Sequence, residues 1–195
     1  MPDSKHFIII IPGLGDRKDG YTFLTRHWKD YGLNVIVYPF GWRDEVSFLK
    51  KLENLIVLID KLSTKGKVSI VGASAGGSAA INAFSARSNK VYKIVNVCGR
   101  LRQGQQTGYR GFISRTQSSD SFRDSVLQCE KNIKTLSIAQ RKKILTLHAK
   151  FGDELVPADT TIIEGATNIS LPYFEHLITI NLAMYFPKKI AKFLK

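Results

Sequence analysis

Short apolar runs alternate with longer amphipathic stretches along the whole chain. A strand that is buried on both faces is apolar throughout, whereas a helix lying on a sheet is apolar only every three to four residues. The short runs predict six strands, at residues 7–11, 35–38, 68–71, 94–97, 144–147 and 161–163. The first three of them end at a proline or a glycine, which favours a turn directly after the strand.

The amphipathic stretches predict helices at residues 21–31, 44–62 and 78–86, and a final helix from about Leu177 that Pro187 breaks. Strands and helices that alternate in this way are typical of the α/β class, in which helices cover a parallel sheet. We therefore expect a three-layer α/β/α sandwich with about six mostly parallel strands, and a single domain over residues 1–195.

Residues 100–124 depart from this alternation, because they are rich in Gly, Gln, Ser and Arg and contain few apolar residues. They connect the fourth and fifth predicted strands. A connection of this length without clear structure either carries function or is mobile.

Hydropathy and cysteine usage narrow the class of protein. The mean hydropathy of the 195 residues is -0.09. No stretch approaches the roughly 18 to 20 apolar residues that span a bilayer. The apolar run at residues 7–11 is too short for the core of a signal peptide, so we expect a cytoplasmic protein.

Cys98 and Cys129 lack metal-ligand spacing, and we expect a reduced pair rather than a disulfide.

The charge is strongly basic, with 29 Lys and Arg residues against 16 Asp and Glu residues and a net charge of +13. The basic residues are spread from Lys5 to Lys195, without a dense block or a nucleic-acid-binding motif. We therefore expect a generally basic surface that associates weakly, if at all, with anionic surfaces, and no specific nucleic-acid partner. The oligomeric state stays open.

The sharpest motif is G-x-S-x-G at residues 72–76, centred on Ser74. It follows an apolar strand and precedes a run of small residues that suits a packed helix, which is the context of a nucleophile elbow. Small neighbours are needed because the serine occupies a strained turn between strand and helix. The alternative is a phosphate-binding loop, but the run lacks the lysine of a P-loop and the G-x-G-x-x-G spacing of a dinucleotide site.

With this motif the chain resembles the α/β-hydrolase superfamily, whose catalytic residues follow the order Ser, acid, His. The resemblance implies Asp153 as the acid, three residues before Val156, and His176 as the base, in a loop that begins near Gly165 and follows the sixth strand. It also implies two oxyanion donors, the backbone N–H of Leu14 and of Ala75, the residue after Ser74. Pro12 stands where many relatives carry His. The oxyanion donors are backbone N–H groups, so this difference leaves their role intact.

Other residues compete for these roles. Glu154 and Asp159 are alternative acids near Asp153. Among the other histidines, His6 and His27 are expected to be structural or surface residues. His148 precedes the acid in the chain, which is the wrong order, and is expected to pack beside the site or to support the acid loop.

The same resemblance places residues 100–124 where relatives insert a lid, although their low hydrophobicity argues against a large apolar lid. The arginines of this lid-position loop either meet an anionic substrate or belong to a solvated loop; they are Arg100, Arg102, Arg110 and Arg115. Cys98 is expected to be a buried small residue, and Trp28 and Trp42 are expected to be packing residues, although Trp42 follows the second strand and can also approach substrate.

The resemblance implies a serine hydrolase that cleaves small carboxylic esters or thioesters through an acyl-enzyme, with no metal and no organic cofactor. A rival hypothesis is a non-catalytic binding protein of the same fold that uses its basic surface, since a fold alone does not dictate function. The presence of all three triad residues together with the oxyanion loop favours the enzyme.

Overall fold

The structure is a computed structural model that describes residues 5–195. Within this range the strands form one sheet in the order β2-β1-β3-β4-β5-β6, and each neighbouring pair is parallel. The strands are β1 His6–Ile11, β2 Leu33–Val37, β3 Lys67–Ala73, β4 Val91–Val97, β5 Ile144–Ala149 and β6 Thr167–Leu171.

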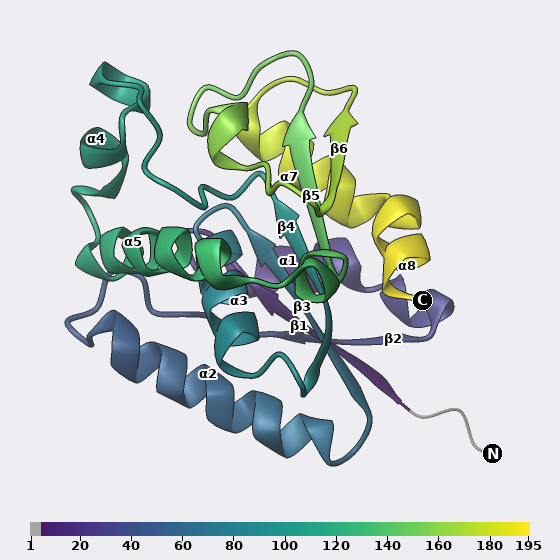
Figure 1. The fold of residues 1–195 in the computed structure, drawn as a ribbon. Helices are drawn as coiled ribbons and strands as arrows, with labels where there is room; N and C mark the ends of the chain where they lie inside the picture. The colour runs from purple at the N-terminus through teal and green to yellow at the C-terminus, as the bar shows by residue number, and fades with distance from the viewer. Residues whose placement is uncertain (1–4) are drawn as a thin grey trace.

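Helices cover both faces of the sheet, which confirms the predicted three-layer α/β/α class (Figure 1). One face carries α2 Phe48–Ser63, α3 Gly76–Ala86 and α5 Asp120–Thr135, and the other carries α1 Lys18–Thr25, α7 His176–Tyr185 and α8 Lys188–Leu194. Short helical turns fill the connections: η1 Trp28–Tyr31, η2 Gly108–Arg110, α4 Phe112–Thr116, α6 Ile138–Arg141 and η3 Ala158–Thr160.

The strand order changes direction at β1, because the chain runs outward from β1 to β2 and then returns to the other side of β1 at β3. In open parallel sheets such a switch point opens a crevice at the carboxyl ends of the strands, where ligands bind. The loops after β1 and β3 therefore lie side by side at this edge.

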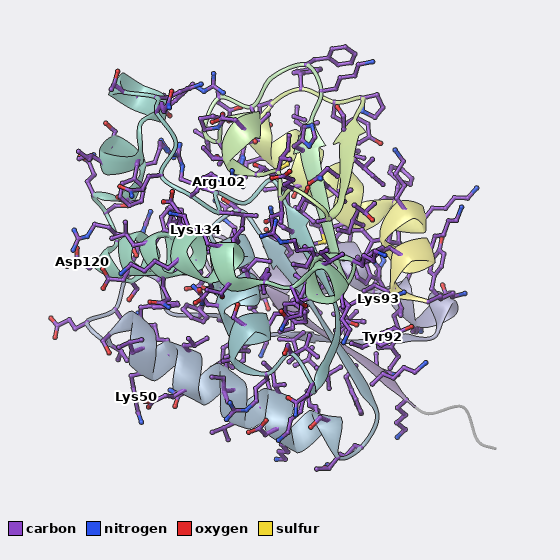
Figure 2. All side chains as sticks on the ribbon, viewed as in Figure 1. Lys50, Tyr92, Lys93, Arg102, Asp120 and Lys134 are labelled. Carbon is purple, nitrogen blue, oxygen red and sulfur yellow. The ribbon has the colours of Figure 1, made fainter. Side chains whose placement is uncertain are left out.

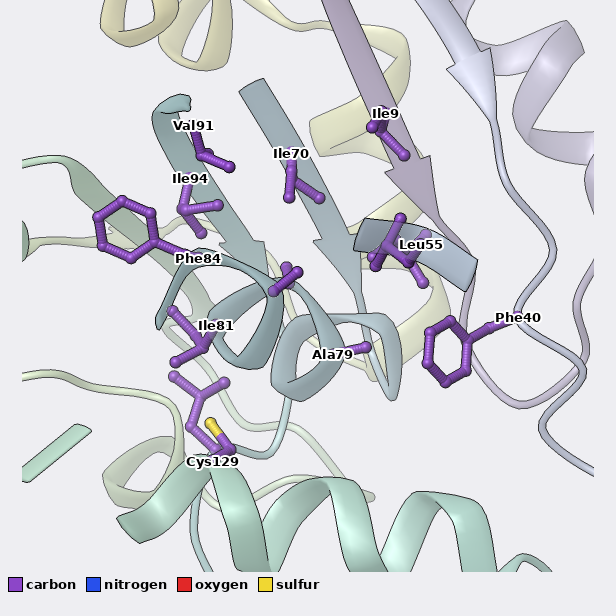
Figure 3. Packing of buried hydrophobic residues seen from close by; sticks show 14 of the residues in the cluster. Ile9, Phe40, Leu55, Ile70, Ala79, Ile81, Phe84, Val91, Ile94 and Cys129 are labelled. Atoms are coloured by element: carbon purple, nitrogen blue, oxygen red, sulfur yellow. The ribbon is translucent and has the colours of Figure 1, made fainter. Parts of the chain in front are cut away.

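The core on the α2–α3–α5 face explains why α3 is rich in small residues (Figure 3). Ala79 of α3 lies close to the sheet, and Ile70 of β3 and Ile94 of β4 pack in the same buried cluster with no exposed surface. Leu55 of α2 and Cys129 of α5 close the cluster from outside. Every residue from Gly76 to Phe84 is buried, so that larger side chains on α3 would hold the helix away from the sheet.

The C-terminal helix is held on the opposite face by two residues of β4, Tyr92 and Lys93, which lie beside it (Figure 2). The Tyr92 hydroxyl donates to the carbonyl of Lys195 over 3.2 Å, and the Lys93 ammonium donates to the carbonyl of Phe193. A cation near the last carbonyls of a helix is favourable, because those carbonyls carry partial negative charge.

The predicted sixth strand at residues 161–163 was wrong, because the last strand is β6. The side chain of Asn168, in β6, accepts from the N–H of Ile163 at 3.1 Å and donates to its carbonyl at 2.9 Å, which ties the turn before the strand to the strand itself. An edge strand that is mostly exposed lacks the continuous apolar run by which buried strands are found.

The predicted helix at residues 21–31 is two shorter elements. An α-helix begins earlier, at Lys18, and ends at Thr25, and the 3₁₀ turn η1 follows. The buried Trp28 indole donates to the carbonyl of Met184 over 2.8 Å, and Gly32 ends the turn with a left-handed φ of 77°. The prediction for residues 44–62 began too early, because Ser47 caps α2 by accepting from the N–H of Lys50.

The segment at residues 100–124 is more regular than its composition predicts. It contains η2 and α4 and the first turn of α5, a helix that the sequence did not reveal. The Ser119 hydroxyl caps α5 by accepting from the N–H of Phe122 over 3.0 Å. In Figure 1 α4 lies above the left end of α5, at the edge of the molecule.

Cys98 and Cys129 are both free and buried, as expected. No helix among residues 5–195 is both long enough and apolar enough to cross a membrane.

The ring of His6, at the start of the sheet, predicts a pH dependence of stability. Burial, and then the charges of Lys67 and Lys93, lower the pKa of His6 to about 4 from an ordinary 6.5. Between these values the unfolded chain binds a proton that the folded chain does not. The contribution of neutral His6 is therefore complete above about pH 6.5 and is lost as the pH falls toward 4.

We expect His6→Gln, whose amide can still bond to Ser69, to lose less stability than the wild type between pH 7 and pH 4.5. Urea unfolding of both proteins across this range measures the difference. Parallel curves would show that His6 is not protonated on unfolding.

Candidate active site

Ser74 sits at the turn between β3 and α3 with a left-handed φ of 52°, an uncommon conformation for a residue with a side chain. Its N–H donates to the carbonyl of Val97 over 2.9 Å, and its carbonyl accepts from the N–H of Gly77 over 3.0 Å. The backbone on both sides of the serine is therefore fixed, and the strained turn directs the hydroxyl out of the carboxyl end of the sheet.

The glycines of the G-x-S-x-G motif are needed for close backbone packing. A β-carbon at Gly72 would lie 2.2 Å from the carbonyl oxygen of Gly76, and one at Gly76 would lie 2.0 Å from that of Ile11. Both distances are far inside van der Waals contact, so no side chain fits without movement of the backbone. The spacing of the motif thus reflects the packing of β1, β3 and α3 at one point.

Three of the predicted site residues form a continuous hydrogen-bonded chain. The hydroxyl of Ser74 lies 2.8 Å from Nε2 of His176, and Nδ1 of the same ring lies 2.8 Å from Oδ2 of Asp153. A carboxylate only accepts, so Nδ1 carries the proton and donates to Asp153. Nε2 is then left as the acceptor for the hydroxyl proton of Ser74, and an imidazole in this state can take up that proton.

The Asp153 carboxylate is itself held in place. Its Oδ1 accepts from the N–H of Leu155 at 2.9 Å and from that of Val156 at 2.8 Å, which leaves Oδ2 for His176. The side chain is buried, so these bonds stabilise a charge that has little access to water. The residues between the acid and the Val-Pro pair, Val156 and Pro157, therefore form a turn around the carboxylate.

His176 is the first residue of α7, and the expectation that it lies in a loop was wrong by one residue. Glu175 caps the helix by accepting from the N–H of Ile178 at 2.7 Å, and it adopts a left-handed φ of 67°. Glu154 accepts from the N–H of His176 itself at 2.9 Å. The buried ring is fixed through its own backbone and through Asp153.

The loop after β1 lies directly against the serine. A β-carbon at Gly13 would be 2.9 Å from the β-carbon of Ser74. Asp16 braces this loop, because its two carboxylate oxygens accept from the N–H groups of Phe40 at 2.8 Å and of Trp42 at 2.9 Å. The Trp42 indole donates to the carbonyl of Pro12 over 3.0 Å, so Trp42 is a buried packing residue and does not line the cavity beside Ser74.

Leu14 and Ala75 directly follow the two residues of this contact, Gly13 and Ser74. Neither N–H donates to another group within residues 5–195. Ala75 is the residue that precedes α3, whose first N–H groups point toward the carboxyl end of the sheet. Two unpaired donors next to a serine can bind an oxygen that carries negative charge.

A cavity of about 520 Å³ opens beside Ser74. One wall is apolar and comes from α1, α7 and the acid loop; it consists of Tyr21, Phe23, Leu24, Leu155, Leu177 and Ile180. Burial raises the pKa of Tyr21 to about 12, so its hydroxyl is neutral. The rest of the lining includes Asp16 and three arginines, Arg17, Arg43 and Arg115.

The other histidines and Cys98 take no part in this hydrogen-bonded chain. The His6 ring bonds to Ser69 and the His27 ring packs edge-on against Tyr185. Burial lowers the pKa of His148, and its Nδ1 has no partner within the described residues. Burial, followed by the charge of Asp153, raises the pKa of the Cys98 thiol well above its usual range, which disfavours a thiolate there.

The roles of the lid-position arginines differ from one another. Arg100 donates to the carbonyls of Gln103 and Arg110 and stabilises the segment internally. Arg102 donates to the carbonyl of Ile162 and ties the segment to the loop before β6. Of the four, Arg115 lines the cavity.

Sequence reasoning missed Asp16 and Glu154 as groups that brace the site, and Arg17 and Arg43 as lining residues. Asp16 directly follows the loop that was singled out, but its partners lie 24 and 26 residues further along the chain. No local pattern indicates such a contact.

Solved structures with a similar fold include lipases and esterases. The monoacylglycerol lipase of Paleococcus ferrophilus shares 14% identity over 98% of this chain and 95% of that chain, with a TM-score of 0.67. Est1E from Butyrivibrio proteoclasticus shares 13% identity over 98% and 90%, with a TM-score of 0.64. The metagenomic carboxyl esterase MGS0156 shares 14% identity over 100% and 76%, with a TM-score of 0.70.

The chain therefore has the α/β-hydrolase fold, as its motifs predicted. No protein-family model and no curated protein sequence matches it. At these identities the likeness is one of fold, and the chemistry has to be argued from the site.

Proposed function

We propose that this protein is a serine hydrolase that cleaves carboxylic esters or thioesters, with Ser74 as nucleophile, His176 as base and Asp153 as the acid that orients the base. The observation that carries the proposal is the unbroken chain of two 2.8 Å contacts from the Ser74 hydroxyl to the Asp153 carboxylate. Several structures of similar fold are named as lipases or esterases, which also supports it.

In the first step the Ser74 oxygen attacks the carbonyl carbon of the substrate while its proton passes to Nε2 of His176. The imidazolium that forms is stabilised by Asp153, whose carboxylate stays ionised. The same proton then moves to the departing alcohol or thiol as the carbon–oxygen or carbon–sulfur bond breaks. The acyl group remains on Ser74. Water, deprotonated by His176, then releases the acid.

The tetrahedral intermediate carries negative charge on the former carbonyl oxygen. The N–H groups of Leu14 and Ala75 are proposed to bind it, each contributing roughly 3 kcal/mol to the stability of the transition state in comparable sites. The α3 N-terminus adds its partial positive charge at the same point. Asp16 acts only through the position of the Leu14 loop.

The rival hypothesis, a non-catalytic scaffold, explains the basic surface but does not require Ser74 to be strained. A left-handed serine costs on the order of 1–3 kcal/mol, and binding through surface lysines gains nothing from it. The buried hydrogen bonds around Asp153 likewise serve the base and no surface. These features favour the enzyme.

A panel of 4-nitrophenyl esters of increasing chain length, with the matching N-acetylcysteamine thioesters and 4-nitroanilides, tests the proposal. We expect turnover of the esters or thioesters and much slower turnover of the anilides, whose leaving group is poorer. A folded wild-type protein that turns over none of them would overturn the proposal.

The contact between Gly13 and Ser74 makes a further prediction. In Gly13→Ala the new methyl group meets the β-carbon of Ser74 at 2.9 Å, so the serine and the oxyanion loop must separate. We expect kcat/KM for ester hydrolysis to fall by about 10²-fold, the scale of a misplacement of about 1 Å.

Gly15→Ala is the matched control in the same loop, because its new methyl group meets the flexible side chain of Arg17 at an ordinary 3.5 Å. Thermal unfolding of both variants separates a local displacement from loss of the fold. If Gly13→Ala and Gly15→Ala had the same kcat/KM for ester hydrolysis, the close approach of the loop to Ser74 would be contradicted.

A further inference from the structure

Three arginines from separate segments of the chain line the cavity of Ser74. Arg17 precedes α1, Arg43 follows β2, and Arg115 belongs to α4. Among residues 5–195 none of the three side chains makes an ion pair or a hydrogen bond. Arg17 and Arg43 are exposed and Arg115 is half-buried. The guanidinium fork matches carboxylate and phosphate oxygens, so three unpaired guanidinium groups at one cavity suit an anionic ligand.

The convergence is built into the fold, because all three segments are tied to the backbone of Trp42. The Asp16 carboxylate accepts from the Trp42 N–H, which joins the segment of Arg17 to that of Arg43. The Ser119 hydroxyl donates to the Trp42 carbonyl, which brings in the end of the segment that carries Arg115. Ordinary surface cations are not held together in this way.

Among the lining residues three arginines face a single carboxylate, which leaves the cavity with an excess of positive charge. The one carboxylate among the residues that line the cavity, that of Asp16, is already engaged by two backbone N–H groups. Arg115 is half-buried, and its guanidinium lies 5.1 Å from the centre of the Tyr109 ring, which limits its orientation. Two arginines away from the cavity do have ion-pair partners: Arg87 pairs with Asp60, and Arg123 with Asp120.

The neighbourhood of Arg115 is also positive. Burial, and then the charges of Arg115 and Arg110, lower the pKa of Arg100, and the carboxylates of Asp159 and Asp153 offset this only in part. The Nε atoms of Arg100 and Arg110 are buried without a hydrogen-bond partner in the described part of the chain. An anion in the cavity would offset this repulsion.

We propose that the substrate of this site is an ester that carries an anionic group, a carboxylate or a phosphate, which Arg43 and Arg115 bind while Arg17 adds to the positive field. The apolar wall from α1 and α7 binds the uncharged part of the same molecule. This inference rests on the proposed ester hydrolysis and narrows it to a substrate class.

Two pairs of esters test which part of the substrate carries the anion. The acyl side is tested with the 4-nitrophenyl monoester of adipic acid against its neutral methyl ester. The alcohol side is tested with 4-acetoxybenzoate against methyl 4-acetoxybenzoate. For each pair we compare the ratio of kcat/KM for the anionic ester to kcat/KM for the neutral ester. The two esters of a pair differ in chemical reactivity, but this difference is the same for the wild type and for the double variant Arg43→Gln/Arg115→Gln, so it cancels between them.

We expect the double variant to lower kcat/KM for the anionic member of one pair by about 10-fold more than for its neutral partner. Arg123→Gln, an exposed arginine on α5 away from the cavity, removes charge elsewhere and is expected to leave the ratio unchanged. In the wild type, raising NaCl from about 20 mM to about 500 mM should raise KM for the anionic ester alone.

The outcomes separate the two proposals. If the wild type cleaves none of the four esters, the proposed hydrolase function fails. If it cleaves them but both pairs keep the same ratio in the double variant, the hydrolase stands and the anionic substrate class is overturned.

Discussion

Ser74→Ala is expected to lower kcat for ester hydrolysis by about 10⁶-fold, the scale on which removal of the nucleophile acts in other triad enzymes. The variant keeps the backbone turn but has no oxygen to attack the carbonyl carbon. Alanine is smaller than serine and fits in the same crowded turn, so the fold should be retained. Steady-state kinetics on the best ester of the panel, with thermal unfolding of both proteins, measures the effect.

The matched control is Ser118→Ala, an exposed serine outside the cavity, which should keep full activity. Residual hydrolysis by Ser74→Ala at the wild-type rate would move the chemistry to another residue. Cys98 would not be the next candidate, because its buried thiol holds its proton.

Asp153→Asn is expected to lower kcat by about 10⁴-fold with little loss of binding. The amide keeps the size of the side chain and can still accept from Leu155 and Val156. Its NH₂ group then faces Nδ1 of His176 and favours the tautomer that protonates Nε2. In that state the ring can no longer accept the proton of Ser74. The pre-steady-state rate of acylation measures this step directly.

Two neighbouring acids give the controls for this result. Asp159→Asn changes an exposed residue of η3 and should have no effect. Glu154→Gln retains an oxygen that can accept from the His176 N–H, so we expect a loss of only a few-fold from its positioning role. A large loss in either, with an active Asp153→Asn, would assign the acid differently.

The sequence predicted the strands best where both faces of the strand are covered. β1, β3 and β5 are nearly continuous apolar runs because helices lie on either side of them. The mostly exposed β6 has no such run, and the search for one led instead to residues 161–163, where Ile163 is buried outside any strand. The pattern reports burial, and burial and strand conformation coincide only in the centre of the sheet.

The helix α5 escaped detection for a related reason. Its polar face is strongly charged, and its buried face includes serines, among them Ser121 and Ser125, in place of apolar residues. Ser125 instead takes part in hydrogen bonds to Ser78 and Asn82 of α3. A helix that packs through a buried polar network has weak apolar periodicity.

The sequence indicated those parts of the candidate site that depend on residues close together in the chain. The glycines around Ser74 and the Val-Pro pair after Asp153 mark turns whose backbone bonds the structure accounts for. The contacts of Asp16 and the convergence of the three cavity arginines join segments far apart in the chain, and only the folded structure brings them together.

Labelling with a fluorophosphonate probe, followed by mass spectrometry of the labelled peptide, tests the central claim most directly. The probe reacts with serines that an adjacent base activates, and it mimics the tetrahedral intermediate in the oxyanion hole. We expect one label per chain on Ser74 of the wild type, and none on His176→Ala, where Ser74 is present but has no base. A folded wild-type protein that stays unlabelled, or a label on another residue, would contradict the account.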